Sequence, residues 1–143
     1  MSRRFARELV LKIAFQMNFD DEDNLTDIAS TVENYRELDE EPQMHELNDN
    51  DRMFVKDILK GIEVNKAMLD QKINEHLVNW TIDRLNILDA AMLRIAAYEI
   101  LFLKDTPKAI IINEALNLVA RFGDEKSTKY INAVLDNIDN DEA

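Results

Sequence analysis

Apolar residues recur at helical spacing along almost the whole chain. The first amphipathic pattern begins at Phe5, a second covers residues 25–38, and a third runs over residues 54–77. We expect each of these stretches to be a helix that buries one face. The first segment shows the pattern most simply, with an apolar residue at every fourth position: Phe5, Leu9, Ile13 and Met17.

Three further stretches predict helices in the second half. Residues 88–103 are apolar nearly all round, which is typical of a helix at the centre of a bundle. A helix over residues 110–122 follows, and Gly123 after it is the residue expected in a left-handed position at a helix end. Ser127 begins the last predicted helix. We therefore predict an all-α bundle of about seven helices in two three-helix-type subdomains.

The same pattern predicts how the chain is divided. We expect an N-terminal helical subdomain over residues 1–78, a C-terminal one over residues 79–138, and an acidic tail over residues 139–143. The third helix is expected to begin at Asn48 or Asp49, because short polar side chains accept hydrogen bonds from the unpaired N–H groups at a helix start.

Composition excludes several kinds of chemistry. The 143 residues include two glycines and no cysteine, which argues against a disulfide framework, a thiolate zinc site and a Gly-rich phosphate loop. No uncharged run is long enough to cross a bilayer, and charged residues begin at Arg3, so we expect neither a membrane span nor a signal peptide. We expect the protein to work in the cytoplasm.

Candidate catalytic groups are sparse. Neither histidine, His45 or His76, has a glutamate three residues before it, so the Glu-x-x-His motif of di-metal helix bundles is missing. None of the three serines lies in a nucleophile-elbow motif. We therefore expect a protein that is not an enzyme and that uses no metal and no cofactor.

Charge is distributed unevenly along the chain. The formal net charge is −12, from 29 acidic and 17 basic residues. Residues 20–51 hold thirteen acidic residues and one arginine, so they carry the whole excess. Residues 1–19 hold four basic residues and one glutamate. The negative total therefore does not argue against a nucleic-acid partner at the N-terminal helix.

The first helix combines side chains that suit RNA. Arginine binds phosphates through paired hydrogen bonds, and an aromatic ring stacks on an unpaired base. The alternative is that these arginines are ordinary solvated charges and that Phe15 packs beneath the next helix. On a helical wheel, the half opposite the apolar stripe carries five residues: Arg4, Arg7, Glu8, Leu11 and Phe15.

Blocks along most of the chain resemble one bacterial family. The arginine-rich opening Arg3-Arg4-x-Ala6-Arg7-Glu8, with an aromatic at Phe15, is the first of them. In order and spacing they resemble the NusB family of transcription antitermination factors, except over the acidic stretch 20–50. The later blocks are Phe54-x-x-x-Ile58-Leu59-x-Gly61, Leu69-Asp70, Leu93-Arg94-Ile95-Ala96-x-Tyr98-Glu99, Ile112-Asn113-Glu114-Ala115, Phe122-Gly123 and Lys129-Tyr130-Ile131-Asn132-x-Val134-Leu135-Asp136.

The resemblance implies an all-α RNA-binding protein that is not an enzyme. It implies binding of single-stranded boxA RNA together with NusE, a small-subunit ribosomal protein that also acts in transcription. That complex would join RNA polymerase with other Nus factors and suppress termination, chiefly in ribosomal RNA operons. The sequence leaves open the exact boxA variant and whether the chain is a monomer or a homodimer.

Residue roles follow from the resemblance by position. The arginines would contact phosphates and Phe15 a base, with a second RNA patch at the start of the last helix. Surface near Asp89 and Lys126 would face NusE. Phe15 stands where the family commonly has Tyr, and Lys12 where it commonly has Gln. The implied RNA contacts are Arg3, Arg4, Arg7, Lys12, Phe15, Lys129 and Tyr130.

Polar residues on otherwise apolar helices have a structural explanation. We expect them to form a buried ion-pair and amide network between the subdomains, because buried charges persist only when they are paired. Trp80 and Tyr98 are expected in the core. The residues of this network would be Arg94, Glu99, Asn113, Glu114, Asn132 and Asp136.

Two functions other than RNA-dependent antitermination are alternatives for this sequence. One is an all-α protein-interaction scaffold that uses the acidic segment 20–51 and binds no RNA. The other is the related RNA-binding domain that elsewhere precedes an RNA cytosine methyltransferase. We expect the second not to apply, because the sequence contains no cofactor-binding domain.

Overall fold

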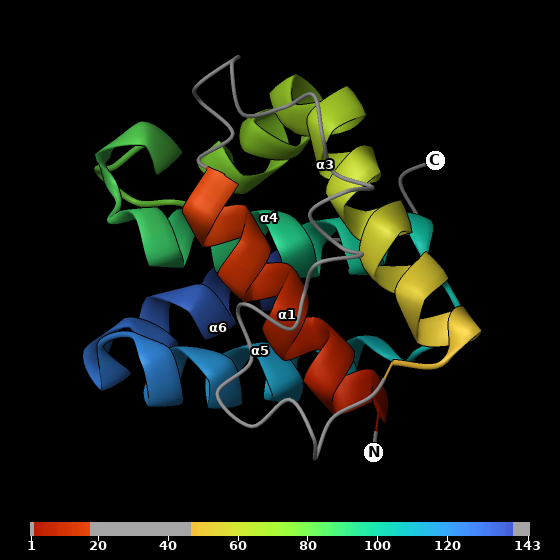
Figure 1. Ribbon diagram of the computed structural model, residues 1–143. Helices are drawn as coiled ribbons and strands as arrows, with labels where there is room; N and C mark the ends of the chain where they lie inside the picture. Colours follow the sequence, from red (N-terminus) through yellow and green to blue (C-terminus); the bar gives the residue numbers. More distant parts are fainter. Residues whose placement is uncertain (1, 18–46, 139–143) are drawn as a thin grey trace. The chain divides into compact units, whose positions relative to one another are not determined.

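Helices form the regular structure of the chain in a computed structural model that describes residues 2–17 and 47–138 (Figure 1). The all-α prediction is confirmed, although the described part holds five α-helices rather than about seven. The predicted helix over residues 25–38 lies outside the described residues. The elements are α1 (Ser2–Met17), α3 (Asp49–Asn74), the 3-10 turn η3 (Ile82–Arg84), α4 (Ile87–Phe102), α5 (Lys108–Phe122), the 3-10 turn η4 (Glu125–Ser127) and α6 (Thr128–Asn137).

Contacts divide the chain into two compact units, Met1–Val64 and Asn65–Ala143. This division falls earlier in the chain than the boundary expected after residue 78. It coincides with a kink inside α3, where Asn65 has the non-helical angles φ −109° and ψ 15°. The helix continues through Gly61, so the interruption of α3 does not occur at its glycine.

The first unit contains α1 and the first part of α3. Asn48 caps α3 as predicted, because its Oδ1 accepts a hydrogen bond of 2.8 Å from the backbone N–H of Asp51. The apolar stripe of α1 is buried at Phe5, Leu9 and Ile13, and so are the matching positions of α3. Burying each such side chain contributes about 1.5–3 kcal/mol. The stripe residues with no more than 2% exposure include Leu9, Ile13, Ile58, Leu59 and Ile62.

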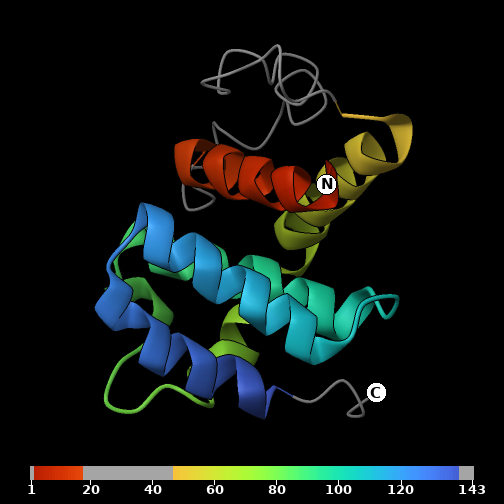
Figure 2. The same cartoon turned by 90° about the horizontal axis from the view of Figure 1, so that it is seen from below.

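The second unit is built around α4. Every residue of α4 from Asp89 to Ile100 is buried, as its all-round apolar sequence predicts. Helices α4, α5 and α6 pack against one another, and both ribbon views show α5 and α6 side by side (Figures 1 and 2). Tyr98 is buried as predicted, whereas Trp80 is 57% exposed, so its predicted place in the core is wrong.

Gly123 ends α5, but not in the left-handed conformation predicted for it. Its angles are φ −124° and ψ −144°, so its φ is negative and lies outside the left-handed region. A Cβ at this position would lie 2.6 Å from Cδ2 of Leu88 and 3.2 Å from the carbonyl oxygen of Val119. The space beside Gly123 is therefore limited by the Leu88 side chain and by the backbone carbonyl of Val119. Among the described residues, no helix is long and apolar enough to span a membrane.

Candidate nucleic-acid interface

The solvent-facing side of α1 is narrower than the wheel predicted. Arg4 and Phe15 are exposed, Phe15 to 48%. Arg7 and Leu11, which the wheel places opposite the apolar stripe, are buried at 6% and 1% exposure, so that half of the helix is not all exposed. A wheel built on one apolar stripe underestimates burial when a helix is covered over more than half of its circumference. The exposed row of α1 therefore runs along Arg4 and Phe15.

Lys12 lies beside this row and pairs within the helix. Its Nζ lies 3.1 Å from Oε2 of Glu8, one turn earlier, and both side chains are partly exposed. Pairs at this spacing stabilise a helix by only about 0.2–0.5 kcal/mol. Lys12 therefore contributes a positive charge that is partly balanced by Glu8.

Arg3 is anchored by two residues from the start of α3. Its Nε donates a hydrogen bond of 3.0 Å to Oδ1 of Asp51. Its guanidinium carbon also lies 4.0 Å from the centre of the Phe54 ring, a distance that gives a cation–π interaction. The Arg3 side chain nevertheless remains 44% exposed, while that of Asp51 is 4% exposed.

Arg7 approaches the same aromatic ring. Its guanidinium carbon lies 5.5 Å from the centre of the Phe54 ring. Two arginines one helical turn apart are thus gathered around one ring and one carboxylate. We call Arg3, Arg7, Asp51 and Phe54 the arginine cluster. Asp51 and Phe54 belong to it because α3 places them one turn apart, a link that sequence periodicity in α1 could not show.

The second predicted patch, at the start of α6, is only partly on the surface. Lys129 and Lys126 are exposed. Tyr130 is half-buried, and its hydroxyl donates a hydrogen bond to Asp89. Burial, and then the hydrogen bond to this carboxylate, raise the pKa of Tyr130 above its ordinary value of 10.0. The hydroxyl is therefore held as a neutral donor.

Asp89 lies inside the second unit rather than on its surface, with 2% exposure. Its Oδ2 accepts hydrogen bonds from Ser127 Oγ at 2.7 Å and from Asn86 Nδ2 at 3.0 Å. The backbone N–H of Asp89 donates to Asn86 Oδ1 at 2.8 Å, which caps α4. The spacing Asn86-x-x-Asp89 resembles a capping box, and this signal could have indicated the structural role from the sequence.

A cavity of about 500 Å³ lies next to Asp89 and Tyr130. Its walls are mainly apolar, and the flanking Val78 and Trp80 are the most exposed apolar side chains near it. Large exposed apolar side chains beside a cavity are typical of binding surfaces. The other lining residues are His76, Leu77, Arg84, Leu85, Asn86, Ala133 and Val134.

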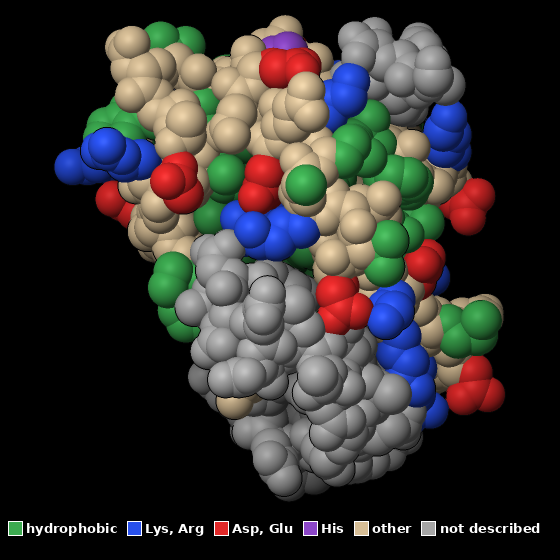
Figure 3. All heavy atoms as spheres, turned by 90° about the horizontal axis from the view of Figure 1, so that it is seen from above, with side chains coloured by type: hydrophobic (Ala, Val, Ile, Leu, Met, Phe, Trp, Pro, Cys, Tyr) green, Lys and Arg blue, Asp and Glu red, His purple; other side chains and the backbone are tan. Residues whose placement is uncertain are grey.

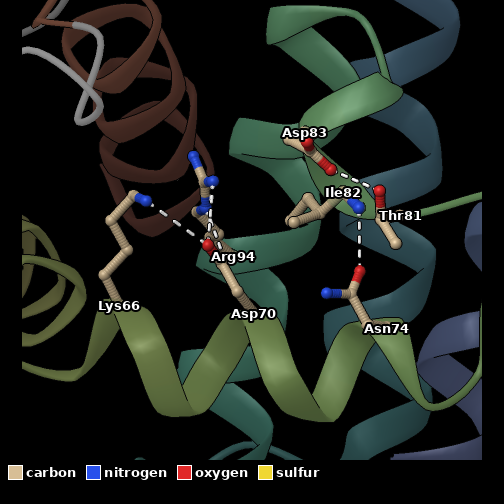
Figure 4. A network of polar contacts seen from close by, with 7 residues as sticks. All are labelled: Lys66, Asp70, Asn74, Thr81, Ile82, Asp83 and Arg94. Atoms are coloured by element: carbon tan, nitrogen blue, oxygen red, sulfur yellow. Dashed lines mark hydrogen bonds and ion pairs between the residues drawn. The ribbon is translucent and has the colours of Figure 1, made fainter.

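Of the predicted buried network, Arg94 is buried and paired as expected, but its partner Asp70 was not among the predicted residues and lies in the same compact unit. Arg94 donates to both carboxylate oxygens of Asp70, at 2.8 and 3.1 Å, and Lys66 reaches Asp70 at 3.4 Å (Figure 4). Glu99 is also buried. The remaining prediction is wrong because these side chains lie on outward positions of α5 and α6: Asn113, Asn132 and Asp136 are exposed and Glu114 is half-buried.

Figure 4 also shows how the turn after α3 is fixed. Asn74 accepts a hydrogen bond of 2.8 Å from the backbone N–H of Ile82, and Thr81 donates to Asp83.

On the face drawn in Figure 3, basic side chains lie beside acidic ones in small groups. Charge on that face is therefore mixed, unlike the basic opening of α1.

Comparison with known proteins gives one consistent family. Residues 4–140 match the NusB family. A Bacillus subtilis (strain 168) protein named transcription antitermination protein NusB is 39% identical over 141 residues, covering 99% of this chain and 97% of the relative. A Clostridium botulinum (strain Kyoto / Type A2) protein of the same name is 40% identical over 141 residues, covering 94% and 97%.

Solved structures agree with the sequence match. NusB of T. maritima superposes with a TM-score of 0.77 at 30% identity, covering 99% of this chain and 92% of that one. A structure of NusB and NusE with dsRNA shares the fold, with a TM-score of 0.74 at 23% identity, covering 96% and 95%. The match covers nearly the whole chain, and the chain belongs to the NusB family.

Proposed function

We propose that this chain is an RNA-binding transcription antitermination factor, without enzymatic activity, that binds single-stranded boxA RNA together with NusE. The observation that carries the proposal is the exposed, anchored guanidinium of Arg3 beside the exposed Arg4 on a helix that also presents Phe15. Family membership supports it, because the curated relatives carry the name transcription antitermination protein.

The proposed RNA surface of α1 combines charge with an aromatic platform. Arg3 and Arg4 bind phosphates, and Lys12 adds positive potential beside them. Phe15 is exposed enough for an unpaired base to stack on its ring. Arg7, which is buried at Phe54, contributes its charge from beneath this surface.

The second unit supplies the other proposed contacts. Lys129 is exposed for a phosphate, and Tyr130 beside it presents the part of its ring that is not buried. NusE is proposed to cover the exposed surface around Lys126. Asp89 supports that surface from within, since its carboxylate already binds three side chains.

The proposed mechanism is assembly rather than chemistry. Joining RNA and NusE in one complex raises their effective concentration at RNA polymerase, where other Nus factors complete the complex. This role places the protein in the bacterial cytoplasm and, following the family resemblance, chiefly at ribosomal RNA operons.

The salt dependence of RNA binding tests the proposal. For single strands, the logarithm of affinity falls with the logarithm of salt concentration by about 0.7 for each phosphate contact. Removing two contacts with the Arg3→Ala, Arg4→Ala double variant should flatten this slope by about 1.4. The Lys60→Ala, Lys104→Ala variant removes the same charge at exposed positions on other elements and should keep the wild-type slope.

Titration of a boxA-containing single-stranded RNA, with and without NusE, provides the measurement. An unchanged slope in the arginine double variant would show that α1 is not the RNA surface. No binding by the wild type even with NusE would instead favour the protein-interaction scaffold. That alternative rests on residues 20–51, most of which lie outside the described residues.

A further inference from the structure

The start of α3 carries two residues that act on the RNA surface without belonging to it. We propose that Asp51 and Phe54 are positioning residues, which hold the guanidinium of Arg3 ready for a phosphate. This inference rests on the proposed function, because it concerns how the RNA surface is prepared. Neither residue is basic, so a search for RNA-binding side chains by charge passes over both.

Within residues 2–17 and 47–138, the contacts to Arg3 leave one edge of its guanidinium for a ligand. Asp51 accepts from Nε, and the Phe54 ring covers one face of the group at 4.0 Å. A guanidinium has five N–H donors, and a phosphate needs two that point the same way. The edge formed by the two terminal nitrogens satisfies that need while Nε stays bonded. The 44% exposure of the side chain is consistent with an accessible edge.

Stability of the fold alone does not explain the buried carboxylate of Asp51. Within the described part of the chain, its Oδ2 is buried and accepts no hydrogen bond. A buried carboxylate with only one oxygen paired is destabilising compared with an apolar residue of similar size. Its placement is also fixed, because its own backbone N–H is bonded to Asn48 at the start of α3. The hydrogen bond from Arg3 explains this arrangement, because it fixes the orientation of the guanidinium.

The anchoring of Arg3 favours RNA binding because it lowers the conformational entropy that the side chain loses when it binds. A flexible arginine loses rotamer freedom when a phosphate fixes it, and this loss weakens binding. In this structure Arg3 is already restrained from two directions before any ligand arrives. Removing either restraint should therefore weaken RNA binding even though Arg3 itself is intact.

Substitution of Asp51 distinguishes a positioning role from a purely electrostatic one, because the two predict opposite changes in RNA affinity. Asp51→Ala removes a negative charge next to the RNA surface, so electrostatics alone predicts tighter RNA binding. Positioning predicts weaker binding, by about fivefold to tenfold. Asp51→Asn keeps an acceptor for Nε and should bind better than the alanine variant. Asp49→Asn is the matched control, since it removes the same charge from an exposed carboxylate that pairs with Arg52.

A change at Phe54 tests the second restraint. Phe54→Leu keeps an apolar side chain in the site but removes the ring, and should weaken binding about threefold. Phe54→Tyr keeps the ring and should restore wild-type affinity. Melting curves of each variant report whether it is folded, and affinity is compared only among folded proteins.

A double-mutant cycle with Arg3→Ala provides the decisive measurement. If Asp51 acts through Arg3, Asp51→Ala should have no further effect on RNA affinity when Arg3 is already alanine. An equal loss in both backgrounds, or tighter binding by Asp51→Ala, would overturn the inference while leaving the proposed function intact. A wild type that binds no RNA, alone or with NusE, would instead overturn the proposed function.

Discussion

The two units each contain an arginine–aspartate pair, and the two pairs differ in what they leave open. Arg94 binds Asp70 through two hydrogen bonds, and both side chains are largely buried. Arg3 binds Asp51 through Nε alone, and its guanidinium is nearly half exposed. The same residue types therefore form a closed contact in one unit and an open one in the other.

This difference indicates which arginine is available to a ligand. Two parallel hydrogen bonds occupy Nε and Nη2 of Arg94, and its side chain is only 8% exposed, so its guanidinium is not accessible to a phosphate. Pairing with a carboxylate is thus not by itself evidence against a binding role, since the geometry of the pair decides. The variants described below test this contrast.

The largest effect on the free energy of unfolding is expected when the buried pair of Arg94 and Asp70 is broken. Arg94→Ala leaves Asp70 as a partly buried carboxylate without its main partner and should lower the free energy of unfolding by about 3–5 kcal/mol. Urea denaturation followed by circular dichroism measures it. A loss below about 1 kcal/mol would place this pair with ordinary surface ion pairs and remove the contrast between the units.

A smaller loss is expected when Tyr130 is ionised. Its pKa is raised in the folded state, so its contribution to stability is complete below pH 10, the ordinary value, and is lost as pH rises above it. Tyr130→Phe should reduce the pH dependence of the melting temperature above pH 10. If wild type and variant lose stability in parallel there, the ionisation of Tyr130 does not contribute to the loss.

Removing the half-exposed arginine should cost less stability than removing the buried one. Arg3→Ala leaves the buried carboxylate of Asp51 without its partner and should cost about 1–3 kcal/mol, because water can reach the half-exposed place that Arg3 vacates. Its effect on RNA affinity should exceed that of Arg94→Ala, measured on the folded fraction of each protein. The reverse order for RNA affinity would contradict the division of roles between the two arginines.

The smallest effect on the free energy of unfolding is expected at the lysine beside the pair of Arg94 and Asp70. Lys66 reaches Asp70 at 3.4 Å and its side chain is 30% exposed. Lys66→Met keeps the apolar part of the side chain and should change the free energy of unfolding by only about 0.3–0.5 kcal/mol. A loss comparable with that of Arg94→Ala would show that Asp70 depends on both cations.

Periodicity predicted the helices well because it reports burial of one face directly. It also identified α4 as central, since few surface helices are apolar on every side. It failed at Arg7 and Leu11, because a helical wheel carries no information about how much of the circumference is covered. The prediction that Trp80 lies in the core was wrong for a related reason, since the hydrophobicity of a side chain alone does not show that it is buried.

The candidate site was predicted in part. Sequence blocks indicated the arginines of α1, but their partners Asp51 and Phe54 come from a helix far along the chain. Such pairing depends on tertiary contacts, which a single sequence does not provide. At Gly123 the position of the helix end was predicted correctly, while the cause proved to be the closeness of Leu88.

The kink at Asn65 has a consequence for how α3 opens. Helix formation is cooperative along a regular backbone, and the non-helical angles of Asn65 break that regularity inside α3. Asp51 and Asp70 lie on opposite sides of this point, in different compact units. Amide hydrogen exchange should therefore divide α3 into two stretches with separate protection, so that the segment under Arg3 can open while the segment under Arg94 stays closed.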